Sequence, residues 1–205
     1  MKILIVYYSM YGHVFALARA VEKGAKSVEG VEVVLRRAAE FEEVIRKTAN
    51  NERIVEVREQ QADIPVCTLD DLREADGVIF GSPTRYGNMT AQLKQLIDTT
   101  AGLWLKGEME GKPAGVFTST ASTHGGQETT LLTMMVPLIH LGMVIVGVPY
   151  STEGMIHTEA HGGTPYGPST IAGANGELHP HPDDLKFASV LGARVASIAK
   201  KLRGS

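Results

Sequence analysis

A short turn near the amino terminus holds the first residues suited to chemistry. The apolar run at residues 3–8 ends in the turn SMYGH at residues 9–13, and apolar side chains at helical spacing begin at Val14. A glycine lets the backbone approach a ligand closely, and the free N–H groups at the start of a helix attract phosphate. The turn is therefore either an ordinary connection capped by Ser9 or one end of an anion site. It contains no Lys or Arg, so a phosphate there would depend on amides, hydroxyls and His13.

Polar loops follow two later apolar runs. The loop SPTRYGN at residues 82–88 offers turn amides, a fixed cation in Arg85 and a stacking face in Tyr86, which together suit a flat heterocycle. The loop STASTHGGQ at residues 119–127 is rich in hydroxyls and small residues, as a loop around a polar ligand would be. An ordinary Pro/Gly turn and a flexible connection remain the alternatives.

Other catalytic motifs are missing from the chain. No G-x-x-x-x-G-K-[ST] occurs, and the segment GEMEGKP at residues 107–113 has the wrong spacing and ends in proline where a hydroxyl is needed. No G-x-G-x-x-G occurs either. A hydrolase using Ser119 or Ser122 with a histidine would lack the G-x-S-x-G elbow. The sequence disfavours a nucleotide triphosphatase, a dinucleotide-fold dehydrogenase and a serine hydrolase.

Four histidines late in the chain raise the question of a metal. His157 and His161 are four residues apart, and His179 and His181 follow. The glycines and proline just after His161 disfavour the helix that would place the first pair on one face, and no cysteine or well-spaced carboxylate set completes the ligands. We therefore expect no metal.

The segments that position these loops are alternately strand-like and helix-like in their hydrophobic pattern. Continuous apolar runs predict buried strands at residues 2–8, 31–35, 77–81, 114–119 and 143–148. Helical spacing predicts helices at about 14–25, 41–47, 69–72, 93–100, 131–139 and 185–202. Such alternation is typical of an open, doubly wound α/β sheet, in which ligands bind at the carboxyl ends of the strands. Two stretches lack a clear pattern: residues 37–66, where 53–59 is ambiguous, and the Gly-, Pro- and His-rich residues 149–182.

Bulk composition narrows the class of protein. The 205 residues, 43% hydrophobic, suit one domain spanning 1–205, and a net charge of -3 gives no reason to expect nucleic-acid binding. Cys67 is the only cysteine, so no internal disulfide forms and a reducing cytoplasm is expected. No run approaches the length of a membrane span, and the amino-terminal apolar run is too short for a secretion signal.

Six segments, taken together and in order, resemble one family. They are YYSMYGH, GSPTRYGNM, GLW, STAS-HGGQE, HLGMVIVGVPY and HGGTPYGPSTIAG, and they cover nearly the whole chain outside residues 37–66. They are similar to the WrbA family of NAD(P)H:quinone oxidoreductases. The resemblance implies a flavodoxin-like five-stranded parallel sheet of order 2-1-3-4-5, with helices on both faces and bound FMN.

The resemblance also implies roles for individual residues. Trp104 would line the quinone site, Tyr11 would contact the nicotinamide cofactor NAD(P)H, and His140, beside the flavin pocket, would orient or protonate the quinone. Tyr86 stands where Phe is frequent, and the third loop is longer and less glycine-rich than in many members, so its contacts are the least defined. The cofactor-binding residues implied are Ser9, Met10, Tyr11, Gly12, His13, Val14, Thr84, Arg85, Tyr86, Ser119, Thr120, Ala121, Ser122, Thr123, His124 and His140.

The implied reaction is a two-electron reduction of a quinone in a ping-pong cycle, in which NAD(P)H gives a hydride to the flavin before the quinone enters the same pocket. The implied assembly is a homotetramer whose pockets are completed by neighbouring subunits, with residues 149–182 in the interface. The alternative is a flavodoxin-type electron carrier that binds FMN without a substrate pocket. A third possibility is that the protein is a non-enzymatic partner of a transcriptional regulator, but no basic helix or DNA-binding motif supports it.

Overall fold

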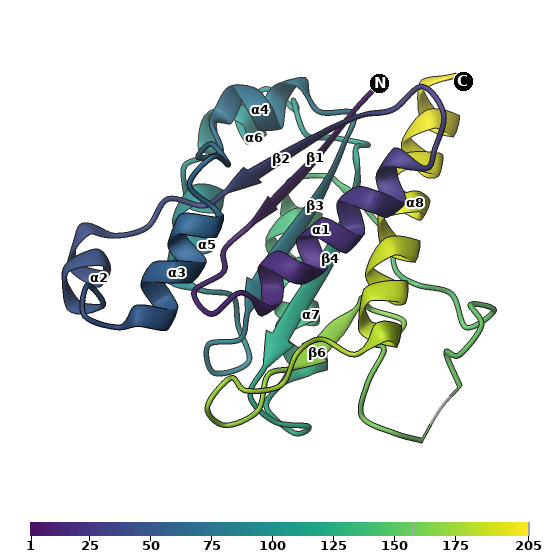
Figure 1. Cartoon of the computed structure of the whole chain (residues 1–205). Coiled ribbons are helices and arrows are strands. Elements are labelled where there is room, and N and C mark those ends of the chain that lie inside the picture. Colours follow the sequence, from purple (N-terminus) through teal and green to yellow (C-terminus); the bar gives the residue numbers. More distant parts are fainter. Residues whose placement is uncertain (157, 205) are drawn as a thin grey trace.

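A parallel sheet forms the centre of the molecule. In the computed structural model, which describes residues 1–156 and 158–204, the strands are ordered β2-β1-β3-β4-β5, and a further strand, β6, pairs with β4. All pairings between these strands are parallel (Figure 1). Both the strand order and the parallel direction predicted from the resemblance are therefore confirmed. The strands are β1 (Lys2–Tyr7), β2 (Glu32–Arg37), β3 (Gly77–Pro83), β4 (Pro113–Thr120), β5 (Val144–Ile145) and β6 (Ser169–Ile171).

Helices cover both faces of this sheet. In Figure 1, α1 and α8 cross in front of the strands, and α7 lies behind them. The helices are α1 (His13–Lys26), α2 (Glu42–Lys47), α3 (Glu52–Gln60), α4 (Leu69–Glu74), α5 (Ala91–Asp98), α6 (Ala101–Leu105), α7 (Gln127–His140) and α8 (Pro182–Arg203). None of those in the described residues combines the length and apolar character needed to cross a bilayer.

Two hydrophobic cores lie on opposite sides of the sheet. One packs the odd-numbered residues of β1, such as Ile3 and Ile5, against α1 and α8. The other packs the even-numbered residues Leu4 and Val6 against α4, α5, α6 and α7. Because successive side chains of a strand point to opposite faces, burial on both faces explains the continuous apolar run in β1.

The edge of the sheet beside β4 is shared by two short strands. We predicted one strand at 143–148, but β5 contains only Val144–Ile145, paired with the start of β4. The chain then leaves β4, and Val148 donates a backbone hydrogen bond to Pro165 (3.0 Å). A Cβ on Gly147 would lie 2.1 Å from the Pro165 carbonyl oxygen, so only glycine permits this approach. The unpredicted strand β6 pairs with the end of β4.

The two unpatterned stretches differ in structure. Residues 37–66 contain the predicted short helix, as α2, and a second helix, α3, in the segment that was ambiguous. Residues 149–182 are mostly irregular apart from β6 among the described residues, and His157 lies outside them. The helix predicted to end near residue 100 continues after a break as α6, so Trp104 lies in a helix and not in a loop.

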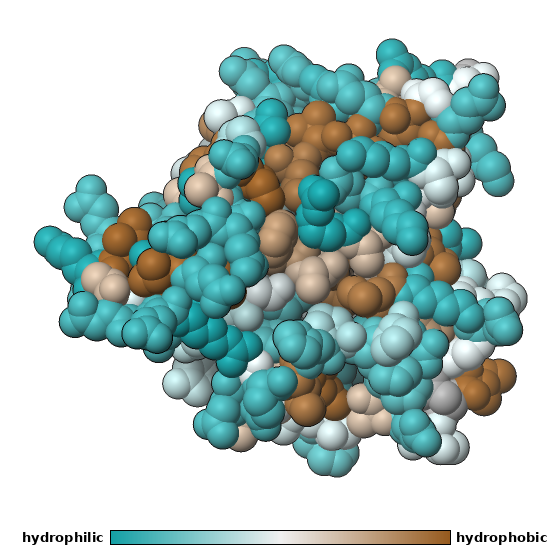
Figure 2. Space-filling model, in the orientation of Figure 1, coloured by the Kyte–Doolittle hydropathy of each residue, from teal (hydrophilic) through white to brown (hydrophobic). Residues whose placement is uncertain are grey.

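The loops after β1, β3 and β4 meet at the carboxyl edge of the sheet, at the lower end of Figure 1, while both chain ends lie at the upper end. Seen from the same side, the surface is mostly hydrophilic, with separate apolar patches, one of them over α2 (Figure 2). In open α/β sheets ligands bind at this carboxyl edge.

Candidate functional site

A cleft of about 430 Å³ lies at the carboxyl edge of the sheet. The loops after β1, β3 and β4 supply most of its wall, and residues after β6 and around the start of α3 complete it. The lining residues are Ser9, Met10, Tyr11, His13, Val14, Asn51, Arg53, Pro83, Thr84, Arg85, Ser119, Thr120, Ala121, Ala172, Gly173, Ala174, Asn175 and Gly176. Ten of the predicted site residues are thus brought together.

The turn after β1 is shaped as an anion cradle. Gly12 precedes α1 with φ 91°, a left-handed conformation that favours glycine, and as the N-cap residue it has no side chain to accept a helix N–H. The first N–H groups of α1 have no partner within the helix. Ser9 Oγ accepts the Phe15 N–H (3.1 Å), which leaves the hydroxyl proton for a ligand. This turn can therefore offer several donors to one anion.

His13 enters the cleft as a neutral ring. The side chain is only 7% exposed, and burial lowers the pKa of its imidazole. Its Nε2 lies 2.9 Å from the Leu178 carbonyl oxygen, which can only accept, so Nε2 carries the proton. His13 therefore ties the first loop to the segment after β6, and it adds no positive charge for a phosphate near neutral pH.

Tyr86 stands at the tip of a tight turn and outside the cleft lining. Arg85 and Asn88 exchange backbone hydrogen bonds of 2.7 and 3.1 Å, and both residues between them have positive φ, 54° for Tyr86 and 75° for Gly87. This is the geometry of a two-residue hairpin turn. The Tyr86 side chain is fully exposed. Thr84 and Arg85 line the cleft, whereas Tyr86 does not reach it within one copy of the chain.

The loop after β4 contributes only its first part. Ser119, Thr120 and Ala121 line the cleft, and Thr120 Oγ1 donates to the Ser122 carbonyl oxygen (2.8 Å). Beyond that bond Ser122 is exposed, and residues 123–124 border a separate hollow that also includes His161. The predicted residues Ser122, Thr123 and His124 are not brought to the cleft.

Arg53 is a cleft residue that the sequence did not indicate. It lies at the start of α3, capped by Asn51, whose side chain accepts the Ile54 N–H. Its guanidinium donates to the backbone carbonyls of Asn175 (2.9 Å) and Gly176 and lies 5.9 Å from the centre of the Tyr11 ring. No motif marks this arginine, because its position depends on how residues 37–66 fold back over the first loop.

Residues 172–176 also line the cleft, and the sequence did not predict this. They follow β6, whose pairing with the end of β4 brings them to the same edge as the other loops. Gly173 has φ 80° and Gly176 φ 71°, so the segment is a glycine-dependent turn. The only hint in the sequence is the short run Ser169–Ile171 followed by small residues. Three residues do not predict a strand by themselves, and this one forms by pairing with β4.

His140 and Trp104 lie at the opposite edge of the sheet. His140 ends α7 just before β5, and β5 pairs with the start of β4, whereas Ser119 and Thr120 end β4. Since β4 spans eight residues, the two edges are roughly 25 Å apart. Trp104, 56% exposed in α6, lies near the same amino edge, where neighbouring Glu108 pairs with Arg73 ahead of β3. Neither side chain reaches the cleft of its own chain.

The residues present fit a flavin mononucleotide. The donors of the first loop and the Arg53 cation suit a phosphate, while the Thr84–Arg85 backbone and the turn at 172–176 flank a slot next to it. Thr84 and Ser119 are joined by a backbone hydrogen bond of 2.8 Å, so two walls of the slot are fixed relative to each other. The arrangement can bind a flat heterocycle with a phosphate tail.

Comparisons with known proteins agree with this geometry. Residues 1–158 match the family described as NADPH-dependent FMN reductase. A protein named NAD(P)H dehydrogenase (quinone) from Geobacter sulfurreducens is 52% identical over 207 residues, covering 100% of both chains. One of the same name from Geotalea uraniireducens is 50% identical over 205 residues, covering 98% of this chain and 99% of the other.

Solved structures share the fold at lower identity. A flavodoxin, WrbA-like protein from Agrobacterium tumefaciens aligns with a TM-score of 0.66 at 22% identity, covering 98% of each chain. A flavodoxin from the domain Archaea aligns with a TM-score of 0.60 at 21% identity, covering 98% of this chain and 99% of the other. A WrbA-like protein and a flavodoxin therefore share this fold, and the fold alone does not assign a function.

Proposed function

We propose, from the premise that this chain belongs to the NADPH-dependent FMN reductase family, that it is an FMN-dependent NAD(P)H:quinone oxidoreductase of the WrbA type. Its relatives at about half identity over the full length are named NAD(P)H dehydrogenase (quinone). The observation that carries the proposal is the convergence of the loops after β1, β3 and β4 on one cleft with donors for a phosphate at one end.

The chain's own residues supply binding and orientation. Bound FMN supplies the capacity to accept and donate two electrons. The amides at the start of α1, the Ser9 hydroxyl and Arg53 hold the phosphate, and Thr84 and Arg85 hold the ring edge. Tyr11, 44% exposed at the cleft and adjacent to Arg53, contacts the nicotinamide cofactor. Because the cleft is a single open site, NAD(P)H and quinone occupy it in turn, which gives ping-pong kinetics.

The assembly we propose is a homotetramer working in the cytoplasm, where reduced nicotinamide cofactors are available. In one chain His140 and Trp104 lie at the edge remote from the cleft, and Tyr86 projects fully into solvent. Association would bring such side chains to the cleft of a neighbouring copy, where Trp104 covers the quinone and His140 orients or protonates its oxygen.

The test has two stages. Titration of the purified protein with FMN is followed in the visible spectrum, and steady-state turnover is then measured with NADH or NADPH and benzoquinone. We expect a flavin spectral shift that saturates at one FMN per chain, followed by quinone turnover with parallel double-reciprocal lines. No spectral shift at saturating FMN would refute the flavin site.

The electron-carrier alternative predicts a different second stage. A flavodoxin-type carrier would bind FMN and yet show no NAD(P)H-dependent quinone turnover. Exchange of electrons with an added redox protein, measured on the same sample, then identifies the carrier. Flavin binding without turnover would therefore reject the enzyme and keep the cofactor site.

A further inference from the structure

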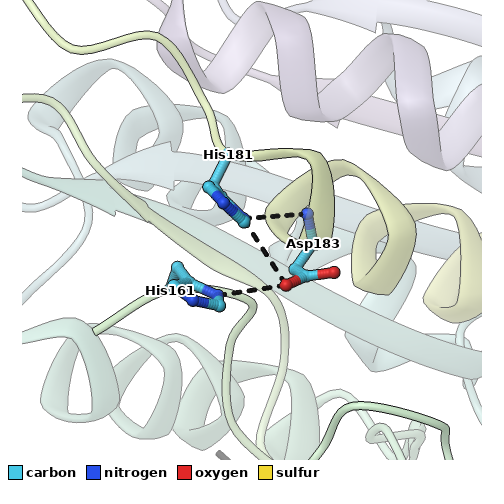
Figure 3. A group of neighbouring side chains, drawn as sticks. All are labelled: His161, His181 and Asp183. Carbon is cyan, nitrogen blue, oxygen red and sulfur yellow. Dashed lines mark hydrogen bonds and ion pairs between the residues drawn. The ribbon is translucent and has the colours of Figure 1, made fainter. Parts of the chain in front are cut away.

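Two histidines and an aspartate meet away from the cleft. His161 lies in the irregular segment between β5 and β6, and His181 and Asp183 flank the start of α8. Figure 3 shows both imidazole rings directed at the Asp183 carboxylate. One atom from each residue, an imidazole nitrogen or a carboxylate oxygen, lies within 4.8 Å of the other two. The sequence spacing indicated no carboxylate to complete these histidines, and the fold brings one to them in Asp183.

The protonation of His161 follows from its neighbours. Its Nε2 lies 3.0 Å from a carboxylate oxygen of Glu159, which can only accept, so Nε2 carries a proton. In the neutral ring Nδ1 then has a lone pair, and it lies 3.3 Å from Asp183 Oδ2. A carboxylate that holds the far nitrogen of a histidine in this way is the usual outer partner of a metal-binding imidazole.

His181 presents a second lone pair to the same oxygen. Its Nδ1 accepts the Asp183 N–H (3.2 Å), so this nitrogen is unprotonated, and it lies 3.5 Å from Asp183 Oδ2. The two rings are stacked with centroids 4.1 Å apart. A carboxylate oxygen and two imidazole nitrogens thus lie together, and these are the donor types that a divalent transition-metal ion binds in proteins.

Two of the three spacings between the ligand atoms match a tetrahedral site, and the third is within 4.8 Å. Zinc bonds of 2.0–2.2 Å to nitrogen and oxygen place neighbouring ligand atoms about 3.3–3.5 Å apart. The two distances from Asp183 Oδ2 to the imidazole nitrogens, 3.3 and 3.5 Å, are of this size before any ion is added. The site is accessible from the side of His181 and Asp183, whose side chains are 49% and 37% exposed, whereas His161 Nδ1 is buried.

A buried carboxylate holds the two halves of the cluster in place. Asp184 is 2% exposed, and it accepts the His181 N–H (2.9 Å) through one oxygen and the Gly162 N–H through the other. Asp184 thereby ties the backbone of His181 to Gly162, the residue that follows His161. The positive end of α8 opposes a cation here, and the carboxylates of Glu159, Asp183 and Asp184 offset it.

We propose that His161, His181 and Asp183 bind a divalent transition-metal ion, with Zn²⁺ as the ion that fits, and that a water molecule completes the tetrahedron. The ion joins the segment before β6 to the start of α8. The intervening residues 172–176 line the cleft, so the metal would stiffen that wall. On binding, the ion takes the lone pair of His181 that now accepts the Asp183 amide, and that amide turns to solvent.

The experiment measures Zn²⁺ binding to tag-free, full-length protein by competition with a chromophoric chelator. We expect one ion per chain, no competition from excess Mg²⁺, and binding at least about 100-fold weaker in His161→Gln and in Asp183→Asn. His181→Asn gives the same loss while keeping a side chain that can cap α8. Glu159→Gln weakens binding by about 10-fold or more, as loss of an outer partner does.

His179→Ala is the matched control, since His179 is exposed on the same segment and outside the cluster. It should bind Zn²⁺ as the wild type does. Thermal melts without metal establish that each variant is folded. Substitution with Co²⁺ should give the d–d bands of a four-coordinate ion without thiolate charge transfer, because the buried Cys67 is not a ligand. Binding of less than one ion per chain, or equal weakening in His179→Ala, would overturn the proposal.

Discussion

At the residue scale, Arg53 links three parts of the cleft. Its guanidinium bonds the backbone at residues 175–176, lies over Tyr11 and extends from α3. His13 bonds the same segment at the Leu178 carbonyl, and its ring is neutral because burial lowers its pKa. The positive charge that the first loop lacks in sequence is therefore provided by a residue some forty positions later, as the chain folds back.

Replacement of Arg53 should weaken FMN binding specifically through the phosphate. We expect Arg53→Gln to reduce FMN affinity by about 10- to 100-fold, the cost of losing a hydrogen bond to a charged group. Riboflavin, which lacks the phosphate, should bind both proteins equally. Arg46→Gln, which removes an exposed arginine from α2, is the control for net charge. Equal losses for FMN and riboflavin would contradict the assignment.

The buried, neutral His13 should make stability depend on pH. Its pKa in the folded protein is lowered below the ordinary value of 6.5, so the unfolded chain binds the extra proton between those two values. Stability should therefore rise with pH up to about 6.5 and then level off, by at most about 1.4 kcal/mol per pH unit for one proton. Urea unfolding of the FMN-free protein at several pH values measures this.

His13→Gln supplies the comparison, since glutamine can still donate to the Leu178 carbonyl and has no titrating ring. The slope of stability against pH below 6.5 should become shallower in this variant. An unchanged slope would show that other groups cause the dependence.

At the element scale, two glycines set the approach of α1 to α8. A Cβ on Gly24 would lie 1.8 Å from the Ser189 carbonyl oxygen, and one on Gly192 would lie 2.1 Å from the Val21 carbonyl oxygen. Backbone atoms cannot yield to such contacts, so the helices would have to separate. The core that packs α1 and α8 on the sheet depends on this close crossing.

Alanine at either position should destabilise the protein although alanine favours helices. We expect Gly24→Ala and Gly192→Ala each to lower the free energy of unfolding by about 1–3 kcal/mol or more. Gly102→Ala is the control, because Gly102 is helical and a Cβ there meets nothing within 4 Å. It should be neutral or stabilise by up to about 1 kcal/mol. Chemical denaturation measures all three, and equal effects would show that crowding is not the cause.

The elements that could be predicted from sequence are those whose pattern is imposed by burial on both faces. β1, β3 and β4 each contain an apolar run that is buried on both faces, and their order follows from the resemblance. β6, a three-residue strand with two hydroxyl residues, forms only because β4 offers a partner. α3 buries only Ile54 and Val57, too few to give a clear helical period.

The site residues could be predicted from sequence to a similar extent. Residues in the loops after β1, β3 and β4 could be placed at one edge from topology alone, because parallel strands end on the same side. Arg53 and residues 172–176 could not, since their positions depend on α3 and β6. The motif that contains His140 could not predict how far this residue lies from the cleft of its own chain, because a motif carries no information on distance.

At the scale of the whole molecule, α7 presents an apolar stripe to solvent. Leu132, Val136 and Ile139 are 41%, 54% and 60% exposed and share one face of the helix. The turn carrying Tyr86 adjoins α7, because Thr133 Oγ1 donates to the Gly87 carbonyl oxygen (2.9 Å). Such a surface fits the proposed association of copies.

A charge in this stripe should dissociate the assembly. We expect Val136→Glu to lower the molar mass measured by light scattering from that of a tetramer, and to lower quinone turnover because His140 and Trp104 no longer reach a neighbouring cleft. Leu202→Glu, also at an exposed apolar residue but on α8, is the control. A monomeric wild type, or a Val136→Glu protein with unchanged mass, would contradict this arrangement.

The division of the sheet edge between β5 and β6 bears on aggregation. A long, flat edge strand is a template on which other chains can add, and proteins avoid this with short or charged edges. At the sheet edge beside β4, the strands β5 and β6 have only two and three residues, and the chain leaves the edge between them at Gly147. The other edge is β2, which includes Glu32, Arg36 and Arg37. The β4 side therefore offers another chain no long row of free backbone groups, and charged side chains protect the β2 edge, so both edges disfavour the addition of a further strand.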